Sequence, residues 1–199
     1  MDSALLEKIK MLRGETEAPL GLCREALEAS KGDLEQAKVY LRQKGAALLE
    51  KKAGERAGQG LVEGYLHFNG KVGALVDLRS QTDFVAKNPE FKLLAHEIAL
   101  QVAMMKPLYL NPEAIPAEAL EAKKKEIHAD LPAEALAKAG VQEKIFAGKL
   151  QKWYAEVCLT EQLYFKDEAL TIRDLINGVA NKFGEKIEVK RFVRLALND

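Results

Sequence analysis

The sequence has few cysteines, no net charge and no long apolar run. Its 199 residues include only two cysteines, Cys23 and Cys158, which lie far apart and form no metal or redox pattern. Thirty basic residues balance thirty acidic ones, whereas a general nucleic-acid binder normally carries a basic excess. No apolar run approaches the roughly 18 residues that span a bilayer, and the amino terminus lacks the pattern of a signal peptide. We therefore expect a reduced, cytoplasmic protein with no membrane contact and no direct nucleic-acid partner.

The composition is otherwise that of an ordinary globular chain. Apolar residues make up 48% of the sequence and charged residues 30%. An apolar fraction of this size is enough to bury a core, which excludes a wholly disordered chain. The length fits one or two domains, since a domain has about 150 residues.

Residues 1–46 are predicted to form a three-helix module. Apolar residues recur at helical spacing in three short stretches, of which the second starts near Pro19. Asp33 and Gln36 resemble a capping box that opens the third helix, and Gly45 is a plausible stop for it. Residues 46–60 are rich in Ala, Gly, Lys and Glu, which predicts a short helical extension followed by a linker. The linker is assigned to 47–60.

The apolar period changes after the linker from helical to alternating. Residues 61–68 and 71–79 are predicted as two strands, and Asn69-Gly70 between them predicts a two-residue type I′ turn. On the second strand one face is apolar, since alternate positions carry Val72, Ala74, Val76 and Leu78. This pattern indicates a β-hairpin with one face in the core.

Helices and a final strand are predicted to complete the domain. Asn88-Pro89 opens a helix whose inward residues are Phe91, Leu94, Ala95, Ile98, Val102 and Met105. We expect two or three more helices within 116–159 and a capped helix over 172–183. Residues 187–197 alternate again, with Ile187, Val189, Val193, Leu195 and Leu197 as their apolar positions. The fold class expected for 61–199 is α+β, a small antiparallel sheet packed with helices.

The histidines and cysteines show no catalytic pattern. His96-Glu97 begins like a zinc-protease helix, but Leu100 stands where a second histidine is required. Cys158 lies in an apolar stretch, where a buried structural thiol is more common than a nucleophile. We therefore expect no enzyme activity, no metal ion and no cofactor.

The segment that joins the hairpin to the next helix has two interpretations. It runs from Thr82 to Phe91 and reads TDFVAKNPEF. In the first interpretation Thr82 or Asp83 caps a helical turn and Phe84 packs into the core. In the second, a short rigid turn holds Asp83 and Phe84 outward, as anchors for a protein partner often are.

This segment resembles the elongation factor Ts family, the nucleotide exchange factors of elongation factor Tu. The similarity extends to residues 12–45, 149–167 and 184–195 and so covers essentially the whole chain. The length corresponds to a short form, without the larger duplicated core and coiled-coil insertion of longer members. The chain departs from the family pattern at Glu17, Gly21, Arg79, Ser80, Gln101, Leu163 and Tyr164.

The resemblance implies a mechanism and a set of contact residues. Thr82, Asp83, Phe84 and Val85 would form an exchange segment, in which Asp83 and Phe84 insert near the magnesium and phosphate site of elongation factor Tu and promote GDP release. No covalent step is involved. The first 46 residues resemble a ubiquitin-associated-type module, which implies a second contact through Leu12, Arg13 and Leu20. Leu12 is equally well interpreted as a core residue of the bundle.

Other functions and assemblies stay open at the level of sequence. The chain could be a helical protein-interaction adaptor without exchange activity, although the Asp83-Phe84 pair favours exchange. Lys190, Arg191 and Arg194 give limited support for binding ribosomal RNA. Residues 187–197 could supply a sheet edge for a homodimer or a 2:2 complex with elongation factor Tu, or form an ordinary internal strand.

Overall fold

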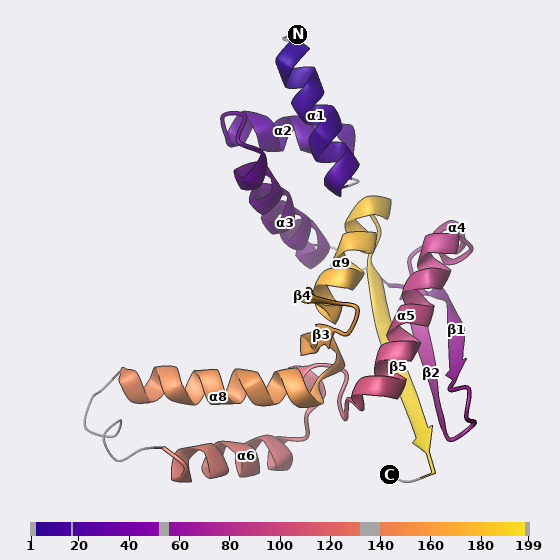
Figure 1. Ribbon diagram of the computed structural model, residues 1–199, viewed down its shortest axis with the longest axis vertical. Helices are drawn as coiled ribbons and strands as arrows, with labels where there is room; N and C mark the ends of the chain where they lie inside the picture. Colours follow the sequence, from indigo (N-terminus) through magenta and orange to yellow (C-terminus); the bar gives the residue numbers. More distant parts are fainter. Residues whose placement is uncertain (1–2, 17, 52–55, 132–139, 198–199) are drawn as a thin grey trace. The chain divides into compact units, whose positions relative to one another are not determined.

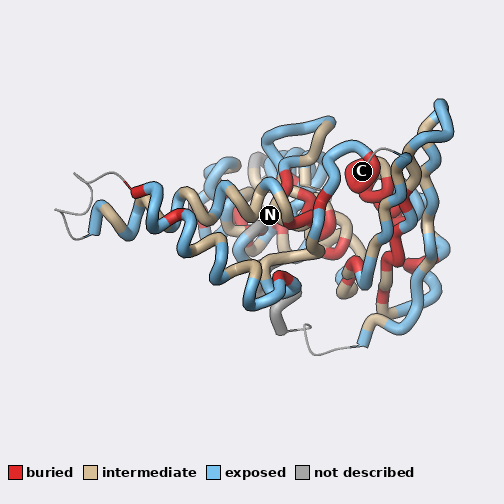
Figure 2. The backbone as a smooth tube through the Cα atoms, turned by 90° about the horizontal axis from the view of Figure 1, so that it is seen from below, coloured by how far each residue is buried: buried red, intermediate tan, exposed pale blue. Residues whose placement is uncertain are grey.

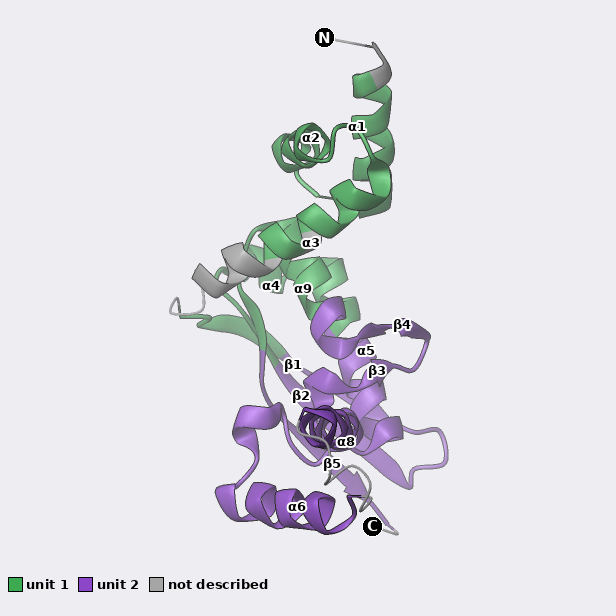
Figure 3. Ribbon diagram, turned by 90° about the vertical axis from the view of Figure 1, so that its left-hand side faces the viewer, with its two compact units in different colours: residues 1–61, 78–94, 176–188 green, residues 62–77, 95–175, 189–199 purple. Residues whose placement is uncertain are grey.

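The computed structural model describes residues 3–16, 18–51, 56–131 and 140–197, and it has a mixed helix and sheet fold (Figure 1). Two compact units are distinguished, shown in Figure 3. The first contains residues 1–61, 78–94 and 176–188, and the second contains 62–77, 95–175 and 189–199. The predicted α+β class is confirmed.

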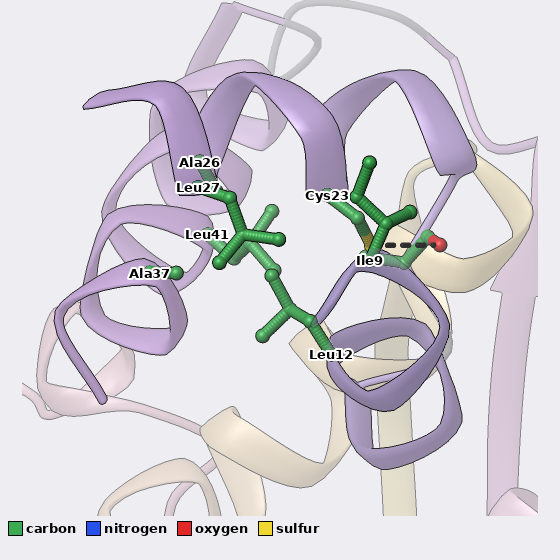
Figure 4. Packing of buried hydrophobic residues seen from close by; sticks show 8 residues of the cluster. Ile9, Leu12, Cys23, Ala26, Leu27, Ala37 and Leu41 are labelled. Carbon is green, nitrogen blue, oxygen red and sulfur yellow. Dashed lines mark hydrogen bonds between the residues drawn. The ribbon is translucent and has the colours of Figure 1, made fainter. Parts of the chain in front are cut away.

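Three helices form the amino-terminal bundle, as predicted. They are α1 (Ser3–Thr16), α2 (Leu20–Ala29) and α3 (Leu34–Lys51). Their apolar faces meet in a common core, seen in Figure 4, whose buried members are Ile9, Leu12, Ala18, Cys23, Ala26, Leu27, Ala37 and Leu41. The Cys23 thiol donates to the carbonyl of Ala18 at 3.4 Å, so this cysteine is a structural core residue.

The third helix begins as predicted but ends later. The Asp33 side chain accepts a hydrogen bond from the Gln36 amide at 2.9 Å, which confirms the cap. The prediction that Gly45 stops the helix is wrong, because α3 continues to Lys51, whereas the helical extension predicted beyond Gly45 is confirmed. A glycine stop needs a left-handed backbone, and Gly45 is not among the described glycines with positive φ.

The larger sheet has three strands in the order β1-β2-β5. Strands β1 (Gln59–Leu66) and β2 (Val72–Ser80) form the predicted hairpin, and β5 (Ile187–Ala196) pairs with β2 at the sheet edge. The Leu197 amide donates to the Lys71 carbonyl at 3.0 Å. The carboxy-terminal segment therefore rejoins the hairpin, as the sequence predicted.

The hairpin turn differs from the predicted type I′ geometry. A type I′ turn needs positive φ at both central residues, but among the described residues near this turn only Gly70 has it, at +67°. The Gly70 amide donates to the His67 carbonyl at 2.8 Å, so Phe68 and Asn69 are the central residues. The His67 amide donates to the Val72 carbonyl at 2.8 Å, so residues 68–71 form a four-residue loop, a length that is most often built around a type I turn.

The short helix α4 (Asp83–Ala86) and the long helix α5 (Pro89–Met105) follow β2. The Asn88 side chain accepts from the Glu90 amide at 2.9 Å, which confirms the predicted helix start. Five of the six residues predicted to face inward are buried, namely Phe91, Leu94, Ala95, Ile98 and Val102. Met105 is 46% exposed, because it is the last residue of the helix and lies beyond the core.

The rest of the chain adds helices and a small second sheet. Helices α6 (Ala117–Ala129) and α8 (Val141–Val157) lie side by side and appear mostly as exposed or intermediate in Figure 2. Two 3₁₀ turns occur at Pro112–Ala114 and Leu159–Glu161. Strands β3 (Leu163–Tyr164) and β4 (Asp167–Thr171) form an antiparallel pair, and α9 (Ile172–Phe183) follows. Thr171 and Asp174 cap α9 reciprocally.

Candidate functional site

The exchange segment is a single capped turn between β2 and α5. Thr82 has an extended backbone, with φ −116° and ψ 156°, and its hydroxyl oxygen accepts from the Val85 amide at 3.4 Å. This is the geometry of an amino-terminal helix cap. A four-residue helix is too short to be stable alone, so its position depends on the cap and on packing.

Adjacent apolar residues of this turn face opposite environments. Val85 is only 2% exposed and anchors α4 in the core, whereas Phe84 is 76% exposed. The interpretation that placed Phe84 in the core is therefore wrong, and the part of it that placed a cap at Thr82 is confirmed. The turn holds Phe84 outward on a backbone that Val85 fixes from the other side.

Asp83 is also on the surface. Its carboxylate accepts from Lys87 Nζ at 2.7 Å, four residues along the chain, and both side chains are largely exposed. The hydrogen bond from Lys87 lowers the pKa of Asp83 below its ordinary value. Because an exposed ion pair adds little to stability, Asp83 is an ionised carboxylate that a partner can engage at small cost.

Glu185 also contacts this turn, which no sequence pattern predicted. One oxygen of its carboxylate accepts from the Thr82 hydroxyl at 2.6 Å, and the other accepts from the Thr82 amide at 3.0 Å. The two residues are separated by 103 positions, so no local spacing could have paired them. The only local signal was Gly184, which ends α9 with φ +65° and places Glu185 in a loop.

The three residues expected to make a second contact differ in exposure. Leu12 is completely buried in the core of the bundle, as its alternative interpretation held. Arg13 is exposed, and Leu20 is 57% exposed at the start of α2. Only Arg13 and Leu20 are therefore available to a partner without a change in the bundle.

One side of the three-stranded sheet carries exposed large apolar residues. They come from all three strands and are named here the apolar sheet face: Val62, Leu66, Leu75, Val193 and Leu195. A Cβ placed on Gly64 would lie 3.1 Å from Leu75 Cδ2, and one on Gly73 would lie 3.5 Å from Leu66 Cδ1. Leu66 and Leu75 thus each lie beside a glycine of the other hairpin strand, on the same side of the sheet.

Hydrogen bonds to α5 identify the opposite side of the sheet. Glu63 Oε1 lies 3.1 Å from His96 Nδ1, and Arg194 Nε donates to the Ala103 carbonyl at 3.0 Å. Ile187 and Val189 are buried, but Val193 and Leu195 are exposed. Burial along β5 therefore changes with position, since the two exposed residues lie nearer the carboxyl end of the strand.

The described part of the chain shows neither a reactive thiol at Cys158 nor a cluster of metal ligands. Burial raises the pKa of the Cys158 thiol to about 11, so the sulfur is neutral and unreactive at ordinary pH. Among the described residues, no group of three or more His, Cys, Asp or Glu side chains is placed to hold a metal ion. Within the same residues, no helix combines the length and hydrophobicity needed to cross a membrane.

Comparison with known proteins places this chain among the translation elongation factors. The sequence model of the family described as elongation factor TS matches residues 48–199. Elongation factor Ts of Thermotoga petrophila is 44% identical over 194 residues, covering 98% of this chain and 96% of the relative. Elongation factor Ts of Coprothermobacter proteolyticus is 46% identical over 191 residues, covering 96% of each. The chain belongs to the elongation factor Ts family.

Proposed function

We propose that this chain is a guanine nucleotide exchange factor of the cytoplasm that binds elongation factor Tu in its GDP form and promotes GDP release. The single observation that supports this most is the environment of Phe84, which is 76% exposed beside the buried Val85. A large exposed aromatic on a fixed backbone has the properties of a protein-binding anchor. Family membership supports elongation factor Tu as the partner.

The proposed exchange step uses the two side chains that the turn exposes, Phe84 and Asp83. Phe84 supplies a rigid apolar volume that inserts between helices of the nucleotide-binding domain and shifts them. Asp83 supplies a carboxylate that competes for hydrogen bonds beside the magnesium ion. Both effects weaken the contacts that elongation factor Tu makes with the β-phosphate of GDP. The barrier to GDP dissociation therefore falls without a covalent step. Thermodynamic linkage requires that GDP weaken binding of the factor by the same ratio.

Two further surfaces are proposed to support the complex. Arg13 and Leu20 of the amino-terminal bundle are exposed and offer a second contact to the nucleotide-binding domain. The apolar sheet face is proposed to bind the same face of a second copy, which gives a homodimer and, with the partner, a 2:2 complex. Its five exposed apolar residues suit face-to-face packing of two sheets.

The test is release of a fluorescent GDP analogue from elongation factor Tu with wild-type factor, Phe84→Ala and Phe68→Ala. Phe68 is the matched control, because it is 93% exposed but lies in the hairpin turn. We expect Phe84→Ala to lose most of the acceleration, since its apolar volume is gone, and Phe68→Ala to keep it. The free energy of unfolding of both variants should stay within about 0.5 kcal/mol of wild type, as is usual for substitutions at exposed positions.

Two outcomes would contradict the proposal. Wild-type factor that leaves the GDP release rate unchanged at saturation would exclude exchange activity, and binding without acceleration would favour the interaction adaptor. A folded Phe84→Ala protein that accelerates release as well as wild type would show that Phe84 is not the wedge.

A further inference from the structure

The turn that carries Phe84 is tied to a loop far away in the sequence. Glu185 accepts two hydrogen bonds from Thr82, one from the hydroxyl at 2.6 Å and one from the amide at 3.0 Å. A third link runs in the opposite direction, since the Lys186 amide donates to the Gln81 side chain at 2.9 Å. The loop between α9 and β5 and the turn after β2 therefore hold each other by backbone and side-chain groups.

These links act on the residues just before the exposed pair. The hydroxyl of buried Ser80 donates to the Thr82 carbonyl at 2.9 Å, so Thr82 is restrained through its amide, hydroxyl and carbonyl. Asp83 and Phe84 follow directly and are exposed. The restraint thus ends where the proposed contact with the partner begins.

Glu185 also determines how Thr82 caps α4. A threonine hydroxyl has one proton and two lone pairs, and its proton rotates to suit its surroundings. Donation to the Glu185 carboxylate fixes that proton, which leaves a lone pair for the Val85 amide at 3.4 Å. Glu185 therefore orients the cap, and the cap sets the direction of the turn that carries Phe84.

We propose that Glu185 is a positioning residue for nucleotide exchange, which aims Phe84 by holding Thr82 from the α9–β5 loop. The inference rests on the proposed exchange function and adds to it a residue outside the exchange segment. Since Phe84 contributes little to the core, Glu185 does not act by stabilising a buried aromatic. Its loss leaves the wedge present but wrongly oriented, and misplacement by about 1 Å can cost a hundredfold in rate.

The experiment measures GDP release from elongation factor Tu against factor concentration for wild type, Glu185→Ala, Glu185→Gln and Glu188→Ala. Glu188 is the matched control, since it is a glutamate three residues further along, in β5, and pairs with Lys186 Nζ at 2.9 Å. We expect Glu185→Ala to lower the maximal release rate roughly tenfold or more, with half-saturation changed less than about threefold because the other contacts remain. Glu188→Ala should keep the wild-type rate.

Glu185→Gln tests the hydrogen bond itself. Its amide oxygen still accepts from Thr82, so we expect a maximal rate between those of wild type and Glu185→Ala. Hydrogen exchange of the Val85 amide should be faster in Glu185→Ala than in wild type, whereas core amides of α5 should be unchanged. This local loosening is the direct sign that the cap has lost its orientation.

The outcomes separate this inference from the exchange function. If wild-type factor does not accelerate GDP release, the proposed function fails first. If wild type accelerates release and Glu185→Ala matches it at every concentration, the positioning role is overturned. A rate loss that accompanies a large fall in melting temperature in both Glu185 variants also overturns it, because the role is then structural.

Discussion

At the residue scale, Phe84 and Val85 show that sequence analysis cannot tell which side chain of a four-residue helix is buried. Both are large and apolar, and so short a segment contains no helical period that could assign them to different faces. Only the packing of the turn shows that Val85 enters the core and Phe84 does not. By contrast, the caps at Thr82, Asp33 and Asn88 were predictable, because side-chain capping depends on neighbours two or three positions away.

Cys158 gives a pH-dependent prediction. Its folded-state pKa is about 11, raised above the ordinary value of 9.0 chiefly by burial. Between these values the unfolded chain binds fewer protons at this site than the folded one, so stability falls as pH rises. We expect the free energy of unfolding, measured with urea from pH 8 to 10.5, to fall more steeply in wild type than in Cys158→Ala. Equal slopes would contradict the raised pKa.

At the element scale, two glycines should respond to alanine in opposite directions. Gly70 has φ +67° in the hairpin turn, and no atom within 4 Å would meet a new Cβ. Gly70→Ala should therefore cost about 1–2 kcal/mol through backbone strain alone. Gly148 lies inside α8 with equally open space, so Gly148→Ala should stabilise by about 0.5–1 kcal/mol. Denaturant unfolding measures both, and destabilisation by Gly148→Ala would refute the helix assignment.

The amino-terminal bundle yields a contrast between an exposed and a buried leucine. Leu20→Ala removes a side chain that is 57% exposed, so it should weaken binding to elongation factor Tu with little effect on unfolding. Leu12→Ala opens a cavity in the bundle and should destabilise the module by roughly 2–5 kcal/mol. Calorimetry measures the affinity of each variant for elongation factor Tu, and circular dichroism during unfolding measures its stability. Unchanged affinity of Leu20→Ala would remove this residue from the proposed contact.

Helices and strands could be predicted from the sequence where the pattern that specifies them lies within the element itself. The bundle, the hairpin, the start of α5 and the capped helix α9 all follow from apolar period and capping residues. The link between Glu185 and Thr82 could not, because it joins loops that only the sheet order brings together. The alternation in 187–197 predicted a strand with two faces. No pattern in the sequence indicated which residues of those faces would be buried by other elements.

At the scale of the whole molecule, Val193 tests the proposed homodimer. It is half exposed on the apolar sheet face, so Val193→Asp should leave the fold intact and place a charge in the interface. We expect sedimentation at micromolar concentration to give a lower mass than wild type, with an unchanged circular dichroism spectrum. Leu108→Asp, at an exposed leucine outside this face, is the control. Wild-type mass in the Val193→Asp variant would exclude an interface here.

The proposed association through the apolar sheet face also has a consequence for heat resistance. Association that occurs only between folded chains stabilises them by mass action. The melting temperature of the wild-type protein should then rise with its concentration, whereas that of Val193→Asp should not. In a cell, the abundance of this factor would set how much heat it withstands.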